Sequence, residues 1–447
     1  MFNENVATDE MGPTRRKAWA MVAAATIGTA CCSTSMVLMS LGLFMKPLSE
    51  EFGWARGDIA FALSAAALSM AAVNPFVGRA IDRFGVKPVL LMSLSTYALA
   101  AMSIPFLAGT GNIWGLHIGY SLVAALGAGS NVIAYVRLLS GWFSGPLENS
   151  RGLALGIAMS GVPLGGAVAG PTIIFLMDMF GWRAGFWGVS AYPLLIGLPL
   201  ALFVIKRSPF EGVRVGSFAR GQRITDETPG LSARQAMKTA PFWIMAAVIF
   251  LMSSCLQGMG IHLPALKMDL GISTEMLALV GAVGSFLGVG GRILAGYLFD
   301  RIFAPYVSMV IFALPAMAAF AVAGYPTLSV AILASLVIAF GGGAESDFIG
   351  YTVGRYFGLR SYGQIFGILY GIFMVGISVG PYLVGVGYDW TGSYEMPFVI
   401  GGVGLLLLVL LLVFLPRFPT EQEIGEGIYA GGTKSGHLDV APRADAA

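Results

Sequence analysis

The chain has 447 residues, of which 56% are hydrophobic and only 11% are charged. Soluble domains carry about a quarter charged residues, so this composition excludes a water-soluble globular protein. The formal net charge of +2 is too small to indicate binding to nucleic acid. The apolar runs are continuous rather than alternating and are long enough to cross a bilayer as helices. The composition therefore predicts an all-α membrane protein.

Twelve apolar windows, separated by charged residues, Gly or Pro, predict twelve membrane-spanning helices. Arg15, Arg16 and Lys17 precede the first window as in a secretory signal, but the window continues to Phe44 without a cleavage site, so we interpret it as a helix. An even number of spans puts both termini on one side. The windows lie near 18–46, 57–79, 87–107, 113–142, 152–178, 184–206, 241–266, 274–298, 305–324, 327–354, 362–388 and 396–416.

The placement of Lys and Arg predicts the orientation. The longest polar stretch between windows, 207–240, follows the sixth window and is rich in Arg, and the positive-inside rule puts such a stretch in the cytoplasm. We expect a cytoplasmic N-terminus (1–17), two membrane units (18–206 and 241–416) and a disordered cytoplasmic tail (417–447) in a bacterial-type inner membrane. The cations left on the opposite side are Lys46, Arg56, Arg183 and Lys267.

An internal repeat supports a division into six plus six helices. Three short patterns recur in order at matching places in each half, separated by 218, 214 and 210 residues. The pairs are Gly78-x-x-x-Asp82-Arg83 with Gly296-x-x-x-Asp300-Arg301, Trp142-Phe143 with Tyr356-Phe357, and Gly166-x-x-x-Gly170-Pro171 with Gly376-x-x-x-Gly380-Pro381.

The stretch from Gly78 to Lys87, Gly-Arg-Ala-Ile-Asp-Arg-Phe-Gly-Val-Lys, resembles the signature loop between helices two and three of the major facilitator superfamily. The resemblance implies twelve transmembrane helices in two pseudo-symmetric six-helix bundles that rock about a central site. It also implies a conformational gate on the cytoplasmic side. The residues carried over to that gate are Asp82, Arg83 and Lys87, with Asp300 and Arg301 in the degenerate second copy.

A second resemblance is narrower. The fourth and fifth windows, together with Phe52-Gly53-Trp54-Ala55-Arg56 and Gly291-Arg292-x-x-x-Gly296, look like the monocarboxylate transporter and oxalate–formate antiporter group, whose substrates are small carboxylates. The matching residues in the fourth and fifth windows are Gly127-Ala128-Gly129, Tyr135, Trp142-Phe143 and Arg151-Gly152-Leu153-Ala154-x-Gly156-Ile157-Ala158-x-x-Gly161.

Arg292 lies about 9 Å from the centre of the eighth window, too deep for easy solvation. Its planar fork suits a carboxylate, and the resemblance assigns the eighth-helix arginine to the substrate carboxylate. A permanent structural ion pair is the other interpretation.

Glu345 and Asp347 in the tenth window lie at a similar depth and are candidates for the coupling proton or for a static pair with Arg292. Residues two apart diverge by about 200° around a helix, so only one is expected to face the centre.

Further candidates for substrate contact are Arg137, Tyr135 and Tyr370. Arg137 lies near the cytoplasmic end of the fourth window, where a structural or gating role with Glu148 as partner is the alternative. The eleventh window contains no Lys or Arg, unlike the oxalate-type antiporters. This difference favours a substrate with one carboxylate.

The expected function is secondary active transport of a small organic monocarboxylate, with a proton, by alternating access. The partners are then the carboxylate, a proton and membrane lipid. No phosphate-binding loop, metal-ligand cluster or catalytic constellation stands in the sequence, so we expect neither an enzyme nor a cofactor. The alternatives are carboxylate exchange, efflux of an unrelated compound, and a transport-dead sensor on the same scaffold.

Overall fold

The computed structural model describes residues 4–38, 40–206, 230–419 and 423. Within these residues, twelve spans are long and apolar enough to cross a membrane. They follow the twelve predicted windows closely; the fourth, for example, runs from Ile113 to Trp142. The tail expected to be disordered, from 420 apart from residue 423, and most of the central polar stretch (207–229) lie outside the described residues.

The first six spans include several pairs of helical segments in place of continuous helices. The segments are α1 (Glu4–Ala30), η1 (Thr34–Leu38), α2 (Leu41–Phe52), α3 (Arg56–Phe84), α4 (Val86–Ala108), α5 (Ile113–Gly127), η2 (Ala128–Ser130), α6 (Val132–Trp142), η3 (Gly145–Ser150), α7 (Arg151–Met159), α8 (Gly161–Phe180), α9 (Trp182–Tyr192), η4 (Pro193–Gly197) and η5 (Leu200–Val204).

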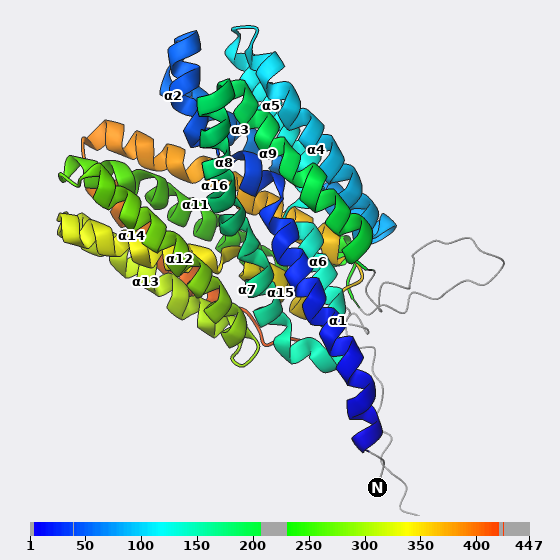
Figure 1. The fold of residues 1–447 in the computed structure, drawn as a ribbon. Helices are drawn as coiled ribbons and strands as arrows, with labels where there is room; N and C mark the ends of the chain where they lie inside the picture. The colour runs from blue at the N-terminus through cyan, green and yellow to red at the C-terminus, as the bar shows by residue number, and fades with distance from the viewer. Residues whose placement is uncertain (1–3, 39, 207–229, 420–422, 424–447) are drawn as a thin grey trace, which may run out of the picture.

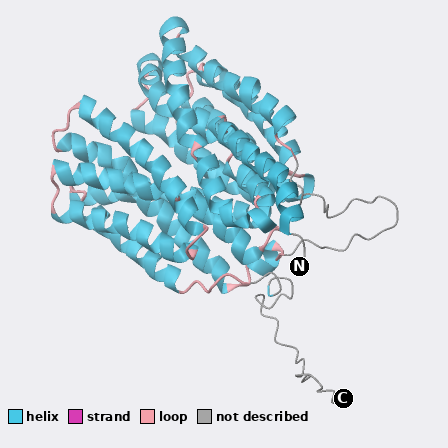
Figure 2. Ribbon diagram, turned by 60° about the horizontal axis from the view of Figure 1, so that its bottom comes forward, coloured by secondary structure: helices cyan, strands magenta, loops and turns pink. Residues whose placement is uncertain are grey.

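The second six spans follow a short connecting helix. The segments are α10 (Ala233–Ala236), α11 (Ala240–Asp269), α12 (Thr274–Phe299), α13 (Ala304–Gly324), α14 (Leu328–Gly343), α15 (Glu345–Phe357), α16 (Tyr362–Thr391) and α17 (Glu395–Val413). Short loops join neighbouring spans (Figure 2). Local chemistry sets several boundaries: the Ser273 hydroxyl accepts from the N–H of Met276 at the start of α12, and Gly85, with φ 85°, makes the turn between α3 and α4.

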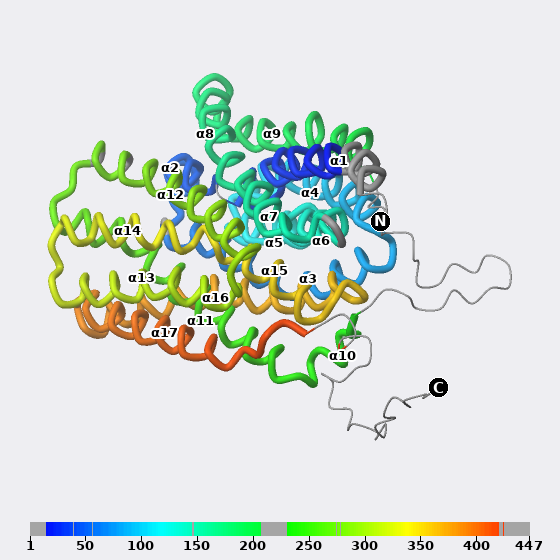
Figure 3. Tube along the Cα trace, turned by 90° about the horizontal axis from the view of Figure 1, so that it is seen from below, coloured from blue at the N-terminus to red at the C-terminus, as the bar shows by residue number. Residues whose placement is uncertain are grey.

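The two halves form separate bundles that meet at one end. We call the membrane side where α1 begins and α17 ends the termini face. There α3 packs on α16, and α7 packs on α12. Toward the other side the bundles spread apart, with α2, α5 and α8 on one arm and α12, α13 and α14 on the other (Figures 1 and 3).

Exposure along α12 agrees with this divergence. Its half away from the termini face exposes Met276, Leu279, Phe286 and Leu287, while Val280 is buried. In its half near the termini face, one side packs on α7 and Ala295 is fully buried, while Leu294 and Tyr297 are exposed. The structure is therefore closed at the termini face and spread at the opposite face.

Glycine pairs permit the closure. A Cβ on Gly78 would lie 1.9 Å from the carbonyl oxygen of Gly363, and a Cβ on Gly296 would lie 2.2 Å from that of Gly152. These distances are far below a van der Waals contact, so no side chain fits in either place. Small residues allow such close helix approach where lipid supplies no hydrophobic drive between helices. The two pairs occupy matching places in the two halves of the chain.

We predict that Gly296→Ala weakens closure at the termini face, because its methyl group would collide with the α7 backbone. Gly290→Ala on the same helix is the matched control, since nothing lies within 4 Å of a Cβ there. The measurement is electron-electron double resonance between spin labels at Trp114 and Tyr325, both exposed, in a cysteine-free background. The distance distribution should shift toward shorter values in Gly296→Ala alone. An unchanged distribution in both variants would contradict the steric argument.

Candidate functional site

Four spans are interrupted in their middle portions. The breaks lie at residues 31–33 between α1 and η1, at Asn131 before α6, at Ser160 between α7 and α8, and at Ala344 between α14 and α15. Interrupted helices expose backbone groups that need other partners, and inside a membrane they occur only where protein or a water-filled cavity supplies them. The breaks therefore mark the polar centre of the molecule.

Arg292 of α12 supplies a partner at one of these breaks. Its Nη1 donates to the carbonyl oxygen of Met159 over 3.0 Å and lies 3.4 Å from the Ser346 hydroxyl. Pro163 has no N–H to donate to the carbonyl four residues earlier, which is that of Met159. A guanidinium from the second bundle thus satisfies a carbonyl left free by a proline in the first bundle.

One donor of the Arg292 guanidinium, its Nε–H, is nevertheless unused within the described residues. Its side chain is 14% exposed, and its Nε lies 4.0 Å from Oδ2 of Asp347, beyond hydrogen-bonding distance. Within the described residues this Nε has no hydrogen-bond partner. The group is buried among polar neighbours but keeps this donor available for another acceptor.

The Gly341-Gly342-Gly343 run ends α14, and α15 starts afresh at Glu345, so Glu345 and Asp347 both lie in the first turn of one helix. Asp347 forms the long ion pair with Arg292, and Glu345 forms none within the described residues; which acid faces the centre stays a prediction. Glu345 is 3% exposed and Asp347 1% exposed. The Gln257 side chain of α11 lies beside the Glu345 carboxyl, and Arg292 is close enough to interact electrostatically with both acids. Oε1 of Glu345 has no hydrogen-bond partner within the described residues.

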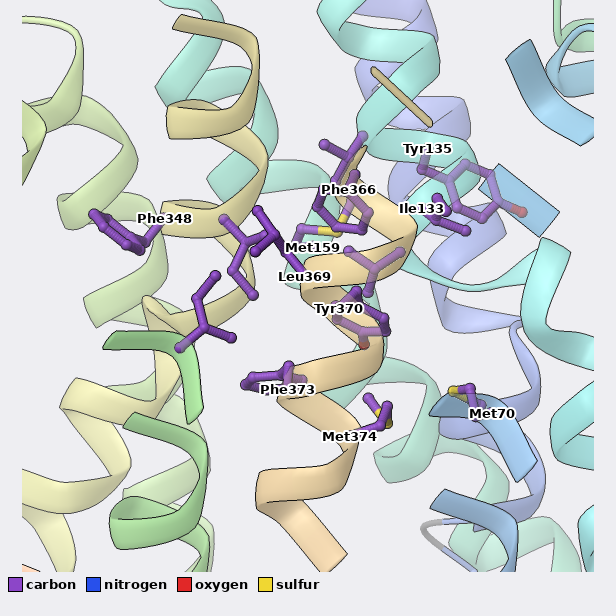
Figure 4. Packing of buried hydrophobic residues seen from close by; sticks show 14 of the residues in the cluster. Met70, Ile133, Tyr135, Met159, Phe348, Phe366, Leu369, Tyr370, Phe373 and Met374 are labelled. Carbon is purple, nitrogen blue, oxygen red and sulfur yellow. The ribbon is translucent and has the colours of Figure 1, made fainter. Parts of the chain in front are cut away.

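The two tyrosine candidates have different surroundings. Tyr370 stacks between Phe366 and Phe373 along α16, with ring centroids 5.4 and 5.2 Å away, and it interacts electrostatically with Arg292 and Glu345. Figure 4 shows Tyr370 on α16 between Phe366 and Phe373. The Tyr135 ring points away from α16 in the same view. Only Tyr370 of the pair therefore adjoins the charged centre.

The sequence analysis missed a polar group on the first bundle. The Asn131 side chain donates to the Ser33 hydroxyl over 3.0 Å and accepts from the Thr34 N–H over 3.3 Å, tying two breaks together. It also missed Gln257, Ser346 and the Met159 carbonyl. Two signals were present in the sequence: Pro163, and isolated amides within apolar runs.

The predicted gate residues form paired contacts at the termini face. The Asp82 carboxylate accepts from the N–H groups of Gly363 and Gln364 at the start of α16, over 2.9 and 2.8 Å. The Asp300 carboxylate accepts from those of Gly152 and Leu153 at the start of α7, over 2.7 and 2.9 Å. Each acid caps a helix of the other bundle, where the free N–H groups and the helix dipole favour an anion.

Asp300 lies just beyond its membrane-spanning helix. Burial raises the pKa of its carboxyl to about 6, against the opposing effect of the N–H groups of Leu153 and Gly152. The carboxyl is therefore mostly ionised at neutral pH, the form that accepts both hydrogen bonds.

The cations predicted to join the gate lie elsewhere, within the described residues. Lys87 donates to the carbonyl oxygen of Leu202 over 2.6 Å, Arg83 lies over the Phe84 ring, and Arg301 covers Tyr297. The cation nearest Asp82 is instead Arg137, whose Nε lies 3.7 Å from Oδ1.

Arg137 therefore lies at the closed termini face and not beside Arg292. Its expected partner Glu148 pairs with Arg355. In the described part of the chain, no group of three His, Cys, Asp or Glu side chains could hold a metal ion.

Comparisons with known proteins agree with this architecture. The family model described as Major Facilitator Superfamily matches residues 25–358. Among curated proteins, human monocarboxylate transporter 11 is 26% identical over 85% of this chain and 79% of its own length. The gentisate transporter of Corynebacterium glutamicum is 25% identical over 87% and 85%. The probable sulfoacetate transporter SauU of Cupriavidus necator is 28% identical over 85% and 90%.

Solved structures share the fold at low identity. The proton:xylose symporter XylE superposes with a TM-score of 0.69 at 13% identity, covering 93% of this chain and all of that one. The human organic anion transporter MFSD10 gives a TM-score of 0.67 at 16% identity, covering 90% and 99%. With its twelve spans, its two bundles and a family match over most of its length, the chain belongs to the major facilitator superfamily and is a membrane transporter, not an enzyme.

Proposed function

We propose that this transporter carries a small organic monocarboxylate across the cytoplasmic membrane together with a proton, by alternating access, with its termini face toward the cytoplasm. The observation that carries the proposal is the buried guanidinium of Arg292, whose Nε–H has no hydrogen-bond partner within the described residues at the meeting point of the bundles. The curated relatives support it, since their names refer to monocarboxylates, gentisate and sulfoacetate.

Arg292 suits an anionic substrate for three reasons. Its charge is permanent, its fork matches a carboxylate, and its Nε lacks a hydrogen bond within the described residues. A substrate carboxylate would accept hydrogen bonds from the guanidinium, including its unused Nε–H, and would replace Asp347 as the nearest anion. Along α16, from Tyr362 to Thr391, there is no second cation, which favours one carboxylate per substrate.

The coupling proton is assigned to the acids of α15. When the substrate carboxylate takes Arg292, an ionised Glu345 or Asp347 would be left as a buried anion without a counter-ion, which is costly in a membrane. Taking up a proton removes that cost. Binding of the anion and binding of the proton then favour each other, as symport requires.

Alternating access requires the termini face to open. In our proposal Asp82 and Asp300 hold it closed through their bonds across the bundles, and breaking these bonds exposes the centre to the cytoplasm. Arg137 strengthens the Asp82 contact and has no role in substrate binding.

Exchange of one carboxylate for another is the rival mechanism. It differs in one observable: a symporter accumulates substrate in proteoliposomes that contain no counter-substrate when a pH gradient is imposed, whereas an obligate exchanger does not.

We predict that Arg292→Ala reduces apparent affinity by roughly 30-fold or more, since losing one partner of a buried charge pair costs about 2–5 kcal/mol. Arg292→Lys should be nearly as impaired, because it keeps the charge and loses the fork. The measurement is uptake of labelled gentisate, sulfoacetate and a short aliphatic monocarboxylate into proteoliposomes. Uptake that survived both substitutions at normal protein levels would remove Arg292 from the site.

For coupling, we predict that the double variant Glu345→Gln/Asp347→Asn no longer responds to an imposed pH gradient, because no exchangeable proton remains beside Arg292. Counterflow of labelled substrate, which needs no proton movement, is the control that reports binding and rocking. A full pH-gradient response in the double variant would exclude both acids as proton carriers.

For the gate, we predict that Asp82→Ala and Asp300→Ala each shift the protein toward a state open at the termini face. Each loses two hydrogen bonds to a charged acceptor, worth about 1.5–3 kcal/mol apiece. Spin labels at Phe84 and Ile302, both exposed at that face, should move apart. Glu50→Ala, at a 67% exposed side chain, is the control and should change nothing; equal behaviour of all three variants would refute the gate.

A further inference from the structure

The charged centre contains two acids and one cation. Glu345 and Asp347 are both almost completely buried in the first turn of α15, and Arg292 is the charged group that acts on each of them. With all three groups ionised, the centre would carry one uncompensated negative charge. With a proton on each acid, the centre would carry one uncompensated positive charge. Unless another cation lies nearby, the centre is neutral only when the two acids hold one proton between them.

The helices packed against α15 supply no such cation within the described residues. Other cations on these helices have partners away from the centre: Arg137 lies by Asp82, Arg151 donates to Ser140, and Lys267 donates to Ser335. Helices α13 and α14 have no charged residue. The remaining titratable or polar groups beside the centre are Tyr370 of α16 and Gln257 of α11. His262 of α11 contacts Tyr394 and the Pro381 carbonyl instead, and Glu275 is exposed at the far end of α12.

An uncompensated charge at this depth is unfavourable. Ions in the membrane interior lose their hydration, and only a nearby opposite charge or several hydrogen bonds offset the loss. One guanidinium can balance one carboxylate. The second carboxyl therefore holds a proton in the substrate-free state.

We propose that Glu345 is the carboxyl that remains protonated through the whole transport cycle, while Asp347 is the one that takes up and releases the transported proton. Asp347 has the shorter contact with Arg292, 4.0 Å from Nε, whereas Glu345 makes no ion pair in the described residues. Proximity to the cation favours ionisation of Asp347.

The partner of Glu345 fits the neutral form. Gln257 lies beside Glu345 and has both an amide N–H and a carbonyl oxygen, so it can donate to the acid's C=O or accept from its O–H. An ionised Glu345 could use only the donor. Oε1 of Glu345 has no hydrogen-bond partner within the described residues, which disfavours the ionised form. Gln257 is thus a positioning residue that stabilises the protonated form of Glu345.

The assignment fixes the charge moved per cycle, and it rests on the proposed carboxylate transport. Empty, the site holds Arg292 positive, Asp347 negative and Glu345 neutral, with a sum of zero. Loaded, a monocarboxylate replaces Asp347 as the partner of Arg292, and one proton from the same solution binds Asp347, so the sum is again zero. Transport of a monocarboxylate is therefore electroneutral, with one proton per anion.

The first test requires no substrate. Infrared spectroscopy of the whole protein in lipid at neutral pH should detect the C=O stretch of a protonated, buried carboxylic acid. The band should vanish in Glu345→Gln, persist in Asp347→Asn and in the exposed control Glu275→Gln, and shift in Gln257→Leu. A wild-type protein without the band, or a band that disappears in Asp347→Asn instead, would overturn the assignment.

The shift in Gln257→Leu keeps this test decisive if Glu345→Gln fails to fold, because it changes the partner of Glu345 and leaves the acid in place. A band that does not respond to Gln257→Leu, in a chain where Glu345→Gln cannot be measured, would count against Glu345 as its source.

The second test measures charge. Proteoliposomes on a solid-supported membrane should give no net transport current with a monocarboxylate whose uptake a pH gradient drives. Inward positive charge would mean that both acids take up protons, and inward negative charge that Asp347 stays ionised; either result refutes the assignment. Lack of uptake of any carboxylate would refute the proposed function. The infrared experiment needs no substrate, so it would still show whether Glu345 is protonated.

Discussion

A guanidinium in the interior of a membrane protein must have polar partners, and the central architecture follows from that requirement. The partners come from places where helices are broken. Pro163 frees the Met159 carbonyl that Arg292 uses. The triple glycine before Ala344 ends α14, and the first turn of α15 brings Ser346 and Asp347 next to the same guanidinium. A continuous helix at residue 159 would have kept that carbonyl occupied.

The closed termini face depends on a different constraint: helices of the two bundles must approach closely enough for their backbones to touch. Glycine pairs bring the backbones into contact, and Asp82 and Asp300 use that proximity to cap helix starts across the contact. The contacts are nearly symmetric between the halves because the chain repeats. Backbone approach and carboxylate capping are therefore one arrangement, since the acids could not reach the N–H groups if side chains separated the helices.

Sequence reasoning predicted the features that depend on local pattern. The spans, the six-plus-six division and the shared depth of Arg292, Glu345 and Asp347 follow from hydropathy, repeats and helix rise. It did not predict the break at Ala344, because the tenth apolar window shows one continuous hydropathy pattern. It also mispaired Arg137 with Glu148, whereas Asp82 and Arg355 are the observed partners. Such pairings depend on how the bundles dock, which hydropathy does not encode.

The bond from Arg292 to Met159 joins the second bundle to the first at the molecular centre. In our proposal the same guanidinium also binds the substrate carboxylate. A bound anion that attracts the guanidinium would weaken its hydrogen bond to Met159. Substrate binding and weakening of the contact between the bundles would then occur together. Substrate binding would then itself permit the conformational change. In the substrate-free transporter, the bond between Arg292 and Met159 would restrain the movement of the two bundles.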